Sequence, residues 1–282
     1  MTNVTPTQPD DHAKEPGSHI YGYSSPAVQA HYVEREAAAA ADFFLPHLSP
    51  GMTLLDCGCG PGTITFGLAE AVAPAETVGV DLEPSMIDRA EAFAKERDVP
   101  NVRFQVADIF ELPFDEGSFD VVYSCAVLEH LGEPVRALRE MGRVLKPGGL
   151  IGVVSTDWAE PLISPSSEAV SLFFDLFERG FNRNRGSMNR GRHLKVMMMK
   201  AGFSVGEFSA DYGNTADPEA VAIRIEGYID WVENLPLFEQ AIDLGWIDRP
   251  SLERMCAEMR EWGKRQDAFM AVGRCSAVGW KS

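Results

Sequence analysis

Short, continuous apolar runs alternate with amphipathic segments between about residues 50 and 155. The apolar runs predict strands at residues 53–57, 77–82, 102–107, 119–125 and 150–155. The amphipathic segments predict helices at residues 62–72, 84–98 and 134–145. Fully apolar strands that alternate with amphipathic helices are typical of a parallel sheet that is covered on both faces. The pattern therefore predicts an α/β domain built on a doubly wound sheet.

The second half of the chain and its N-terminus follow other patterns. Beyond residue 155 we predict a helix at 190–201 and strands at 203–210 and 269–280. The remaining parts of this half are an irregular segment at 158–187 and an aromatic-rich, helical stretch at about 217–266. At the N-terminus, residues 1–18 are polar and contain several prolines, which predicts a disordered leader, and residues 28–48 predict an Ala-rich helix.

These elements predict one domain over residues 19–282. We expect two inserts, at about 158–187 and 215–267, to form a helical cap together with the N-terminal segment. The cap is expected over the carboxyl edge of the sheet, because ligands of open α/β sheets bind at that edge.

The composition narrows the function and the compartment. The formal net charge of −17 opposes non-specific binding to DNA or RNA, where affinity comes mainly from Lys and Arg on phosphates. The chain has no run of about 18 apolar residues, so we expect no membrane span. Its first twenty residues hold no apolar segment typical of a secretory signal, so we expect none. Its five cysteines form no C-x-x-C pair. A cytoplasmic protein without a structural metal is expected.

A glycine-rich turn follows the first predicted strand. Asp56 precedes Gly58, Gly60 and Gly62, and Thr63 stands where a dinucleotide fingerprint has its third glycine. Glycine allows a positive φ and the close approach of a ligand, and the helix that follows offers free N–H groups. The turn predicts a nucleotide-like ligand. The acid beside it suits a ligand with positive charge better than a pyrophosphate.

Two more acids end the next two predicted strands. Asp81 lies about twenty residues beyond the glycine turn, where a carboxylate can accept both ribose hydroxyl hydrogens, as it also does in NAD enzymes. Asp108 ends the third strand, where dinucleotide enzymes have no general need of an acid. The alternatives are an acid at a helix N-terminus for Asp81 and a surface turn for Asp108.

The ordered motifs resemble those of the class I S-adenosylmethionine (SAM) methyltransferases. The glycine turn resembles motif I, residues 119–131 resemble motif IV and the segment after it, and residues 146–150 resemble the turn before strand five. The resemblance implies a seven-stranded Rossmann-like sheet of order 3-2-1-4-5-7-6 with an antiparallel last strand. It also implies SAM as cofactor and S-adenosylhomocysteine as product. The chain is most similar to ubiquinone/menaquinone-type and natural-product methyltransferases.

The same resemblance implies which residues contact the cofactor. Asp108 would accept a hydrogen bond from the adenine amino group, and Ile109 would pack on the ring. Further implied contacts are Cys59, Leu82, Met86 and Cys125. Tyr21, with Tyr23 beside it, would shield the sulfonium of SAM by presenting a ring face to its charge. A packing role of these tyrosines on the N-terminal helix is the alternative.

The methyl acceptor is expected to be a small organic molecule that reacts through O, N, C or S. Enzymes of this fold that methylate DNA amines or glutamine amides carry an Asn/Asp-Pro-Pro-aromatic sequence after strand four, whereas this chain has residues 124–127, Ser-Cys-Ala-Val. No metal cluster of Asp and Asn is evident either. His130 is the first candidate general base and Asp157 the second. A packing or cofactor-side role of His130 is the alternative.

The predicted inserts hold many aromatic residues and one group of basic residues. The aromatic residues are Trp158, Phe173, Phe174, Phe177, Phe181, Trp231, Phe238, Trp246 and Trp262. They form either the core of the cap or the wall of an acceptor pocket. The basic residues are Arg183, Arg185, Arg190, Arg192, His193 and Lys195, which either anchor an acidic substrate or form a solvated helix start.

Two other functions stay open from the sequence. A nicotinamide-dependent oxidoreductase has a similar sheet and glycine turn. A SAM-binding protein that has lost methyl transfer would keep every cofactor motif. The identity of the acceptor and the oligomeric state do not follow from the sequence.

Overall fold

A seven-stranded sheet organises the chain, and its strand order is β3-β2-β1-β4-β5-β7-β6. The computed structural model describes residues 37–183 and 185–282. The strands are β1 (Leu54–Cys57), β2 (Thr77–Asp81), β3 (Val102–Val106), β4 (Phe119–Cys125), β5 (Leu145–Ser164), β6 (Phe203–Thr215) and β7 (Phe269–Lys281). The first five strands are parallel, and β7 runs antiparallel to both β5 and β6. The predicted order and the antiparallel last strand are confirmed.

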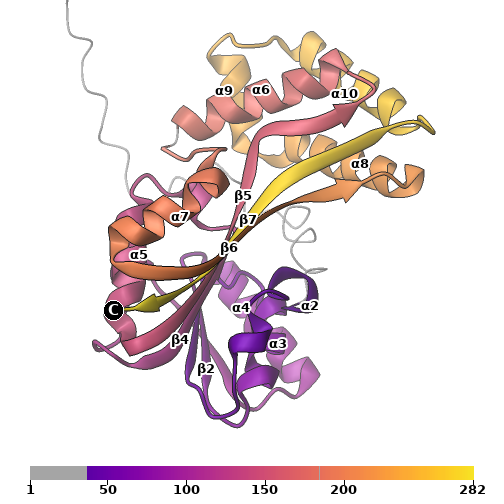
Figure 1. Ribbon diagram of the computed structural model, residues 1–282. Coiled ribbons are helices and arrows are strands. Elements are labelled where there is room, and N and C mark those ends of the chain that lie inside the picture. Colours follow the sequence, from indigo (N-terminus) through magenta and orange to yellow (C-terminus); the bar gives the residue numbers. More distant parts are fainter. Residues whose placement is uncertain (1–36, 184) are drawn as a thin grey trace, which may run out of the picture.

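Helices cover both faces of this sheet (Figure 1). The short helix α2 (Ala37–Ala40), α3 (Thr63–Val72) and α4 (Pro84–Arg97) lie on one face, and α5 (Pro134–Val144) and α7 (Arg190–Ala201) lie on the other. Leu54 and Leu55 of β1 illustrate why. Both are fully buried, but alternate side chains of a strand point to opposite faces, so the two leucines contribute to different core clusters.

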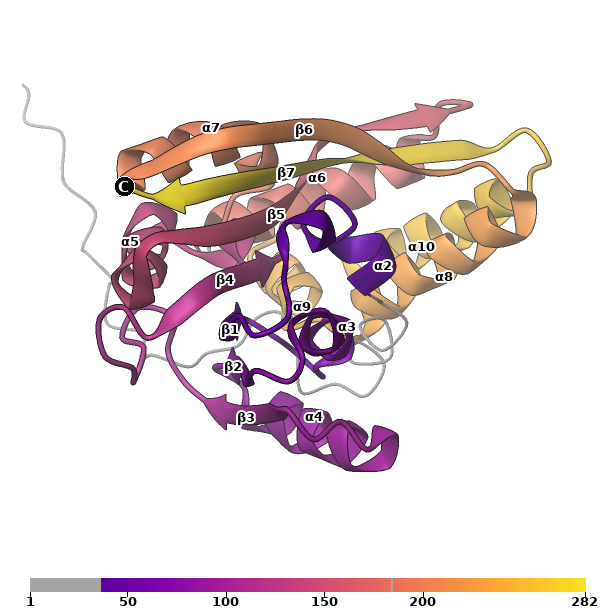
Figure 2. The same ribbon diagram turned by 60° about the horizontal axis from the view of Figure 1, so that its bottom comes forward.

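Strand β5 is much longer than the predicted strand at 150–155. It runs over 20 residues and stays paired with β7 as far as the pair Ser164–Phe269. The helix α6 (Glu168–Arg183) follows directly. The prediction of an irregular segment at 158–187 was therefore wrong, because pairing with β7 extends the strand and the apolar face of α6 is buried. Figure 2 shows the long strands β5, β6 and β7 running beyond β4.

The predicted helix at 28–48 was wrong in its C-terminal part, and its first residues lie outside the described part of the chain. The described helix ends at Ala40, a turn follows, and a short 3-10 helix, η1, spans Leu45–His47. Phe44 in the turn is fully buried against Tyr123, with their ring centroids 5.5 Å apart. Packing of Phe44 against the sheet replaces continuation of the helix.

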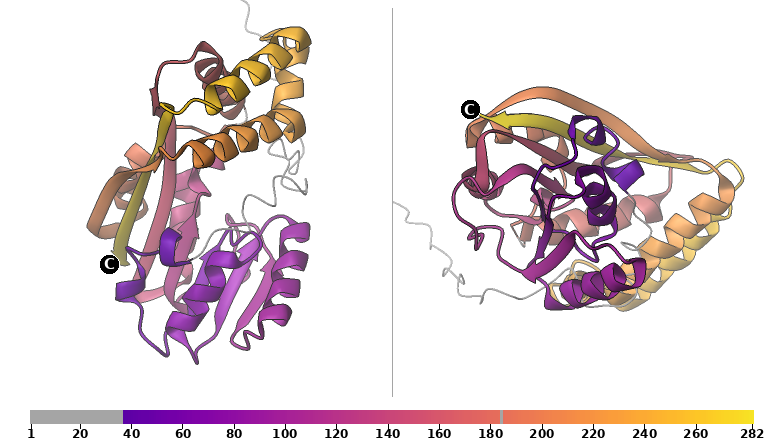
Figure 3. Two further views of the ribbon diagram at one scale, coloured as in Figure 1. Left: turned by 90° about the vertical axis from the view of Figure 1, so that its right-hand side faces the viewer. Right: turned by 90° about the horizontal axis from the view of Figure 1, so that it is seen from below.

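Four helices form a separate layer beyond the end of the sheet: α6, α8 (Pro218–Asn234), α9 (Pro236–Asp243) and α10 (Arg249–Gly263). Their buried residues make up one hydrophobic cluster, to which the far end of the long strands also contributes. Figure 3 shows the orange and yellow helices of this layer at the opposite end of the molecule from the indigo and purple elements. We call these four helices the helical layer. Within the described residues, none of the helices combines the length and apolarity that crossing a membrane requires.

Candidate functional site

The glycine turn lies at the carboxyl end of β1, before α3. Gly58, Gly60 and Gly62 all have positive φ, and the Gly58 N–H donates to the carbonyl of Val80 in β2 over 2.7 Å. A Cβ on Gly58 would overlap the Val127 side chain, whereas a Cβ on Gly60 would meet open space. The turn therefore packs against the loop after β4 on one side and leaves Gly60 accessible to a ligand on the other.

Asp81 at the carboxyl end of β2 fixes this turn. Its Oδ2 accepts the N–H of Gly60 at 2.9 Å, and its Oδ1 accepts the N–H of Glu83 at 3.0 Å. Burial raises the pKa of this carboxyl, while the two backbone hydrogen bonds act in the opposite direction. Each carboxylate oxygen has two lone pairs. Asp81 therefore keeps acceptor capacity for two further hydroxyl groups.

Asp56 is buried beneath the same turn. Its Oδ2 accepts the hydroxyl of Thr65 in α3 at 2.6 Å. Burial raises the pKa of Asp56 to about 7, the Thr65 hydrogen bond opposes this, and the nearby charge of Asp81 adds to it. Asp56 thus ties β1 to α3 and is the group whose charge state changes near neutral pH.

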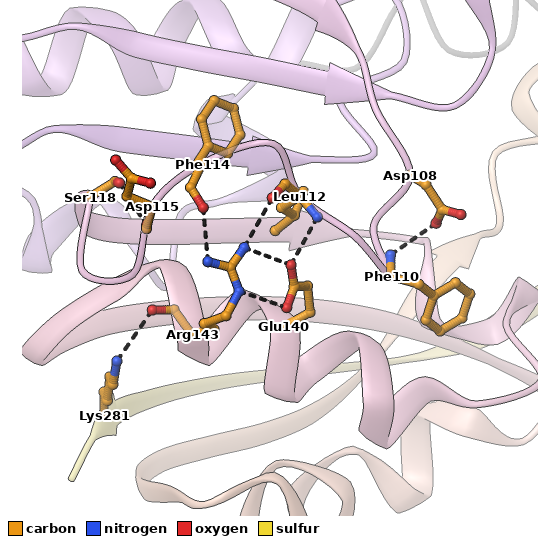
Figure 4. A network of polar contacts seen from close by, with 9 residues as sticks. All are labelled: Asp108, Phe110, Leu112, Phe114, Asp115, Ser118, Glu140, Arg143 and Lys281. Carbon is orange, nitrogen blue, oxygen red and sulfur yellow. Dashed lines mark hydrogen bonds and ion pairs between the residues drawn. The ribbon is translucent and has the colours of Figure 1, made fainter.

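Asp108 follows β3 at the same edge of the sheet, on an exposed loop. Its Oδ1 accepts the N–H of Phe110 at 2.9 Å, which fixes the start of the loop (Figure 4). Arg143 of α5 holds the rest of the loop by donating to the carbonyls of Leu112 and Phe114. The second oxygen of Asp108 carries no hydrogen bond among the described residues and lies on a loop that is held in place.

Arg143 is itself held by Glu140, one turn earlier in α5. The Glu140 carboxylate also accepts the N–H of Leu112 at 2.8 Å, so both ends of this ion pair contact the loop (Figure 4). The hydrogen bonds and charge of Arg143 lower the pKa of Glu140, although partial burial opposes them. α5 thus anchors the loop that carries Asp108.

The apolar residues expected around the cofactor differ in exposure. Leu82 is 54% exposed beside Asp81, and Ile109 and Cys125 are half-buried. Cys59 and Met86 are buried, and burial raises the pKa of the Cys59 thiol well above its ordinary value. Leu82 and Ile109 thus offer apolar surface at the edge, while Cys59 and Met86 lie beneath it.

The loop after β4 contains a backbone feature that the sequence did not indicate. Ala126 has a φ of 56°, which is uncommon for a residue with a side chain, and its N–H donates to Val154 of β5. Such conformations cluster at functional sites. The loop continues into a short 3-10 helix, η2 (Leu128–His130). Ala126 changes the direction of the chain at the end of β4, four residues before the candidate base His130.

His130 ends this short helix and contacts the helical layer. Its ring centroid lies 5.3 Å from that of Phe181 in α6. The preceding Glu129 is buried, and its carboxylate accepts the Ser155 hydroxyl of β5 at 2.9 Å. The sequence gave no indication that Glu129 is buried, because its partner Ser155 lies on another strand. The two contacts join η2 to both β5 and α6.

Asp157 of β5 is engaged by Arg192 of α7. The Arg192 side chain donates to Oδ2 at 2.8 Å and to Oδ1 at 2.7 Å, and its N–H donates to Oδ2 at 2.9 Å. Burial would raise the pKa of Asp157, but the hydrogen bonds and charge of Arg192 outweigh it and lower the pKa. A carboxylate held this way is a weaker base than a free one, which argues against the expected role of general base.

The basic residues 183–195 do not act as one group. Arg192 binds Asp157, while Arg190 donates to the carbonyl of Leu131 at 3.1 Å. Arg183, Arg185, His193 and Lys195 have exposed side chains. Burial lowers the pKa of Arg190. Arg192 thus has a structural role in its ion pair with Asp157, whereas Arg190 lies beside the loop that carries His130.

Aromatic rings connect His130 to the interior of the helical layer. Phe181 contacts Phe177 at 4.8 Å between centroids, and Phe177 stacks on Trp231 of α8 at 5.5 Å. Trp158, which directly follows Asp157, contacts Phe177 and Trp231 at 6.1 and 5.8 Å. We call Trp158, Phe173, Phe177, Phe181, Tyr228 and Trp231 the aromatic cluster. It begins on β5 just beyond the pair Cys125–Val154, where β4 ends, and extends into the layer.

The N-terminal tyrosines and a metal cluster add nothing to the site among the described residues. Tyr21, Tyr23 and the leader at 1–18 lie outside the described residues. Across residues 37–183 and 185–282, His, Cys, Asp and Glu form no group of three that could hold a metal ion.

Comparisons with known proteins agree on the chemistry of the family. A family model described as a methyltransferase domain matches residues 48–181. A probable methyltransferase of Aspergillus luteorubrus, ltbC, is 29% identical over 279 residues, which cover 92% of this chain and 96% of that protein. A demethylmenaquinone methyltransferase of Lactococcus lactis is 36% identical over 125 residues, which cover 44% of this chain and 49% of that protein.

A solved structure extends the likeness in fold to nearly the whole chain. The [4+2]-cyclase SpnF superposes with a TM-score of 0.56 and 22% identity, and the match covers 93% of each chain. The family model and the relatives named as methyltransferases confirm the expected family, and the nicotinamide alternative is set aside. Since the matched segment carries the glycine turn and its acids in the expected order along the expected sheet, residues 48–181 form a methyltransferase domain of the SAM-dependent type.

Proposed function

We propose that the chain transfers the methyl group of SAM to a small organic molecule bound between the carboxyl edge of the sheet and the helical layer. The observation that carries the proposal is the position of the three acids. Asp56, Asp81 and Asp108 follow or end β1, β2 and β3, and parallel neighbouring strands bring their carboxyl ends together. The aromatic cluster begins at the same edge, after Asp157 of β5.

The described residues fit SAM. Gly60 leaves open space where a Cβ would stand, and Asp81 keeps acceptor capacity for the ribose hydroxyls. Asp108 has an oxygen that remains available to the adenine amino group, with half-buried Ile109 beside it to pack on the ring. Leu82, Met86, Cys59 and Cys125 are proposed as the apolar surroundings of the cofactor. Tyr21 remains a proposal from the sequence.

When bound, SAM supplies a methyl group on a sulfonium, which is a good leaving group. The tasks of the protein are to align the acceptor, to exclude water and to accept a proton. We assign the proton to His130, because imidazole titrates near neutral pH and η2 holds it at the edge of the aromatic cluster. Asp157 is assigned a positioning role, since its ion pair with Arg192 fixes α7 against β5.

The proposed domain organisation assigns the acceptor to the helical layer and SAM to the sheet. We propose that inserts at about 158–187 and 215–267 form the cap over the acceptor, within a single domain of residues 19–282. The support is that α6, α8, α9 and α10 share one buried cluster. A small-molecule partner is proposed, and the acidic charge of −17 argues against nucleic acid as the acceptor.

The test is transfer from labelled SAM to a panel of phenols, quinols, amines and thiols, combined with calorimetry using SAM, S-adenosylhomocysteine and NADPH. We expect saturable binding of SAM and of its product, and labelling of at least one acceptor class. His130→Ala should lower the turnover number more than the affinity for SAM. Binding of SAM without labelling of any acceptor would support the non-methylating scaffold, and binding of NADPH alone would contradict the family assignment.

A further inference from the structure

The inner face of α8 carries two polar side chains within the aromatic cluster. Arg224, Tyr228 and Trp231 are spaced by four and three residues, so they lie on one face of the helix. Tyr228 is 2% exposed, and its hydroxyl lies within hydrogen-bonding reach of the Arg224 side chain but meets no acceptor among the described residues. The Nε of Arg224 is likewise buried without a partner in that part of the chain. Two buried donors thus face the cluster together.

Aromatic rings surround the tyrosine. The Tyr228 ring stacks on Phe173 at 4.9 Å between centroids and meets the edges of Phe174 at 5.8 Å and Trp158 at 6.4 Å. Burial raises the pKa of Tyr228, and the charge of Arg224 acts against this. The guanidinium and the hydroxyl are therefore close enough to interact, and the tyrosine ring lies beside Trp158 of β5.

The three acids that follow Arg224 in α8 have other partners. Glu226 and Glu233 bind Arg260 of α10 at 3.1 and 3.6 Å, and Asp230 binds Asn234 of its own helix. No ion pair of Arg224 is found among the described residues, in a chain with 42 acidic and 25 basic residues. A buried donor without an acceptor costs about 1–3 kcal/mol. Two such donors side by side indicate a group that both can bind.

We propose that Arg224 and Tyr228 bind the carboxylate of an aromatic acid, which is the methyl acceptor. This inference rests on the proposed function and names its substrate class. The guanidinium matches the planar geometry of a carboxylate, and the tyrosine hydroxyl supplies a further donor. The rings of Trp158, Phe173 and Trp231 provide an apolar environment for the aromatic part of the acceptor.

Other arginines of the region are less suited to this task. Arg192 is saturated by Asp157 and Glu160. The Nε of Arg190 is also buried without a partner among the described residues, but Arg190 donates to the Leu131 carbonyl beside the η2 loop, and none of its printed contacts is to the aromatic cluster. Arg179 of α6 pairs with Asp175 at 3.1 Å. Arg224 is the arginine that combines a buried, unsatisfied donor with contact to a cluster ring.

The experiment compares acids with their uncharged amides. The full-length protein, saturated with S-adenosylhomocysteine, is titrated by calorimetry with 1-hydroxy-2-naphthoate and 2,4-dihydroxybenzoate and with the primary amide of each. Saturation with S-adenosylhomocysteine is measured first, so that failure of the cofactor site is recognised separately. For the wild type we expect at least one acid to bind about tenfold more tightly than its amide, as a charge-assisted hydrogen bond predicts.

The variants assign the preference to its residues. Arg224→Gln should abolish the preference for the acid, and Tyr228→Phe should reduce it by about threefold or more, as loss of one hydrogen bond predicts. Arg260→Gln serves as the matched control, because it removes an exposed arginine of the same layer, and should keep the preference. If Arg224→Gln does not fold, Tyr228→Phe still tests the pair.

Three results would overturn the inference. They are equal binding of both acids and their amides, no binding of either acid, and a preference that survives in Arg224→Gln or disappears in Arg190→Gln instead. Saturation with S-adenosylhomocysteine is measured beforehand in the same samples. Where the protein is saturated, each of these results would leave the proposed methyl transfer standing with a different acceptor.

Discussion

The cofactor side of the sheet and the helical layer are built on different principles. On the cofactor side, the contacts join acids to backbone N–H groups or to a hydroxyl. Asp56 binds a hydroxyl 9 residues later in the chain, and Asp81 binds N–H groups 21 residues before and 2 residues after it. In the layer, rings from three elements meet, as in the contacts of Trp158 with Phe177 and Trp231. The comparison teaches that the proposed donor site is encoded by local polar motifs, whereas the proposed acceptor site depends on long-range apolar packing.

The largest effect is expected in the layer. Phe173→Ala removes a fully buried ring that stacks on Phe177, Tyr228 and Phe238, and should lower the free energy of unfolding by about 3–5 kcal/mol. The measurement is urea unfolding, followed by calorimetry with SAM below the transition. SAM affinity should stay within about threefold of the wild type, since it is encoded on the other side.

Phe208→Ala is the matched control for this substitution. Phe208 lies on the edge strand β6 and is 38% exposed, so its loss should cost under about 1 kcal/mol. A loss of SAM binding in Phe173→Ala protein that is still folded would show that the two sides are not independent.

The next effect is a pH dependence on the cofactor side. Burial raises the pKa of Asp56 from 3.8 to about 7. Between pH 3.8 and pH 7, therefore, the Asp56 carboxyl is protonated in the folded state and ionised in the unfolded state. The contribution of Asp56 to stability is therefore full below about pH 4 and is lost as the pH rises through 7. Asp56→Asn should remove this loss and be more stable than the wild type by about 2–4 kcal/mol at pH 8.

This prediction is checked by urea unfolding at pH 5 and pH 8. The difference between Asp56→Asn and the wild type should grow with pH, whereas Asp88→Asn, an exposed position of α4, should show no such growth. A constant difference across the two pH values would contradict the assignment of the buried proton to Asp56.

A smaller effect is expected on the affinity for SAM, the methyl donor, when Asp81 is replaced. Asp81→Ala removes the acceptor of the Gly60 and Glu83 N–H groups and of the ribose hydroxyls, so SAM binding should weaken by about 1–3 kcal/mol. Asp108→Ala should weaken it within the same range, since it also leaves a polar group of the donor unpaired. Calorimetry with SAM measures both, and unchanged affinity in both variants would place the cofactor elsewhere.

The smallest effect concerns the junction of the two sides. Asp157→Asn weakens the ion pair with Arg192, whose side chain is 41% exposed and therefore screened, so the cost at pH 7 should be about 1 kcal/mol. Because the pKa of Asp157 is lowered below 3.8, its contribution is present above that value and is lost as the pH falls further. The stability difference should shrink between pH 5 and pH 3, and a difference that grows toward low pH would argue against this ion pair.

Most of the sheet, and the gathering of the proposed donor-site residues at its edge, could be predicted from the sequence, because local patterns determine them. The apolar strands, the glycine turn and the acids at strand ends are short-range features, and their order along the chain matched the family. The extension of β5 and the helix α6 could not be predicted, since that part of the strand is stabilised by β7, as in the pair Ile163–Met270. The ion pair of Asp157 was missed for the same reason, because Arg192 lies 35 residues later.

The most direct test of the central claim is a crystal structure of the full-length protein with S-adenosylhomocysteine. The account predicts the ribose against Asp81, the adenine between Asp108 and Ile109, and the sulfur directed toward His130 and the aromatic cluster. The product bound at another edge of the sheet, or with its sulfur turned away from the helical layer, would contradict it.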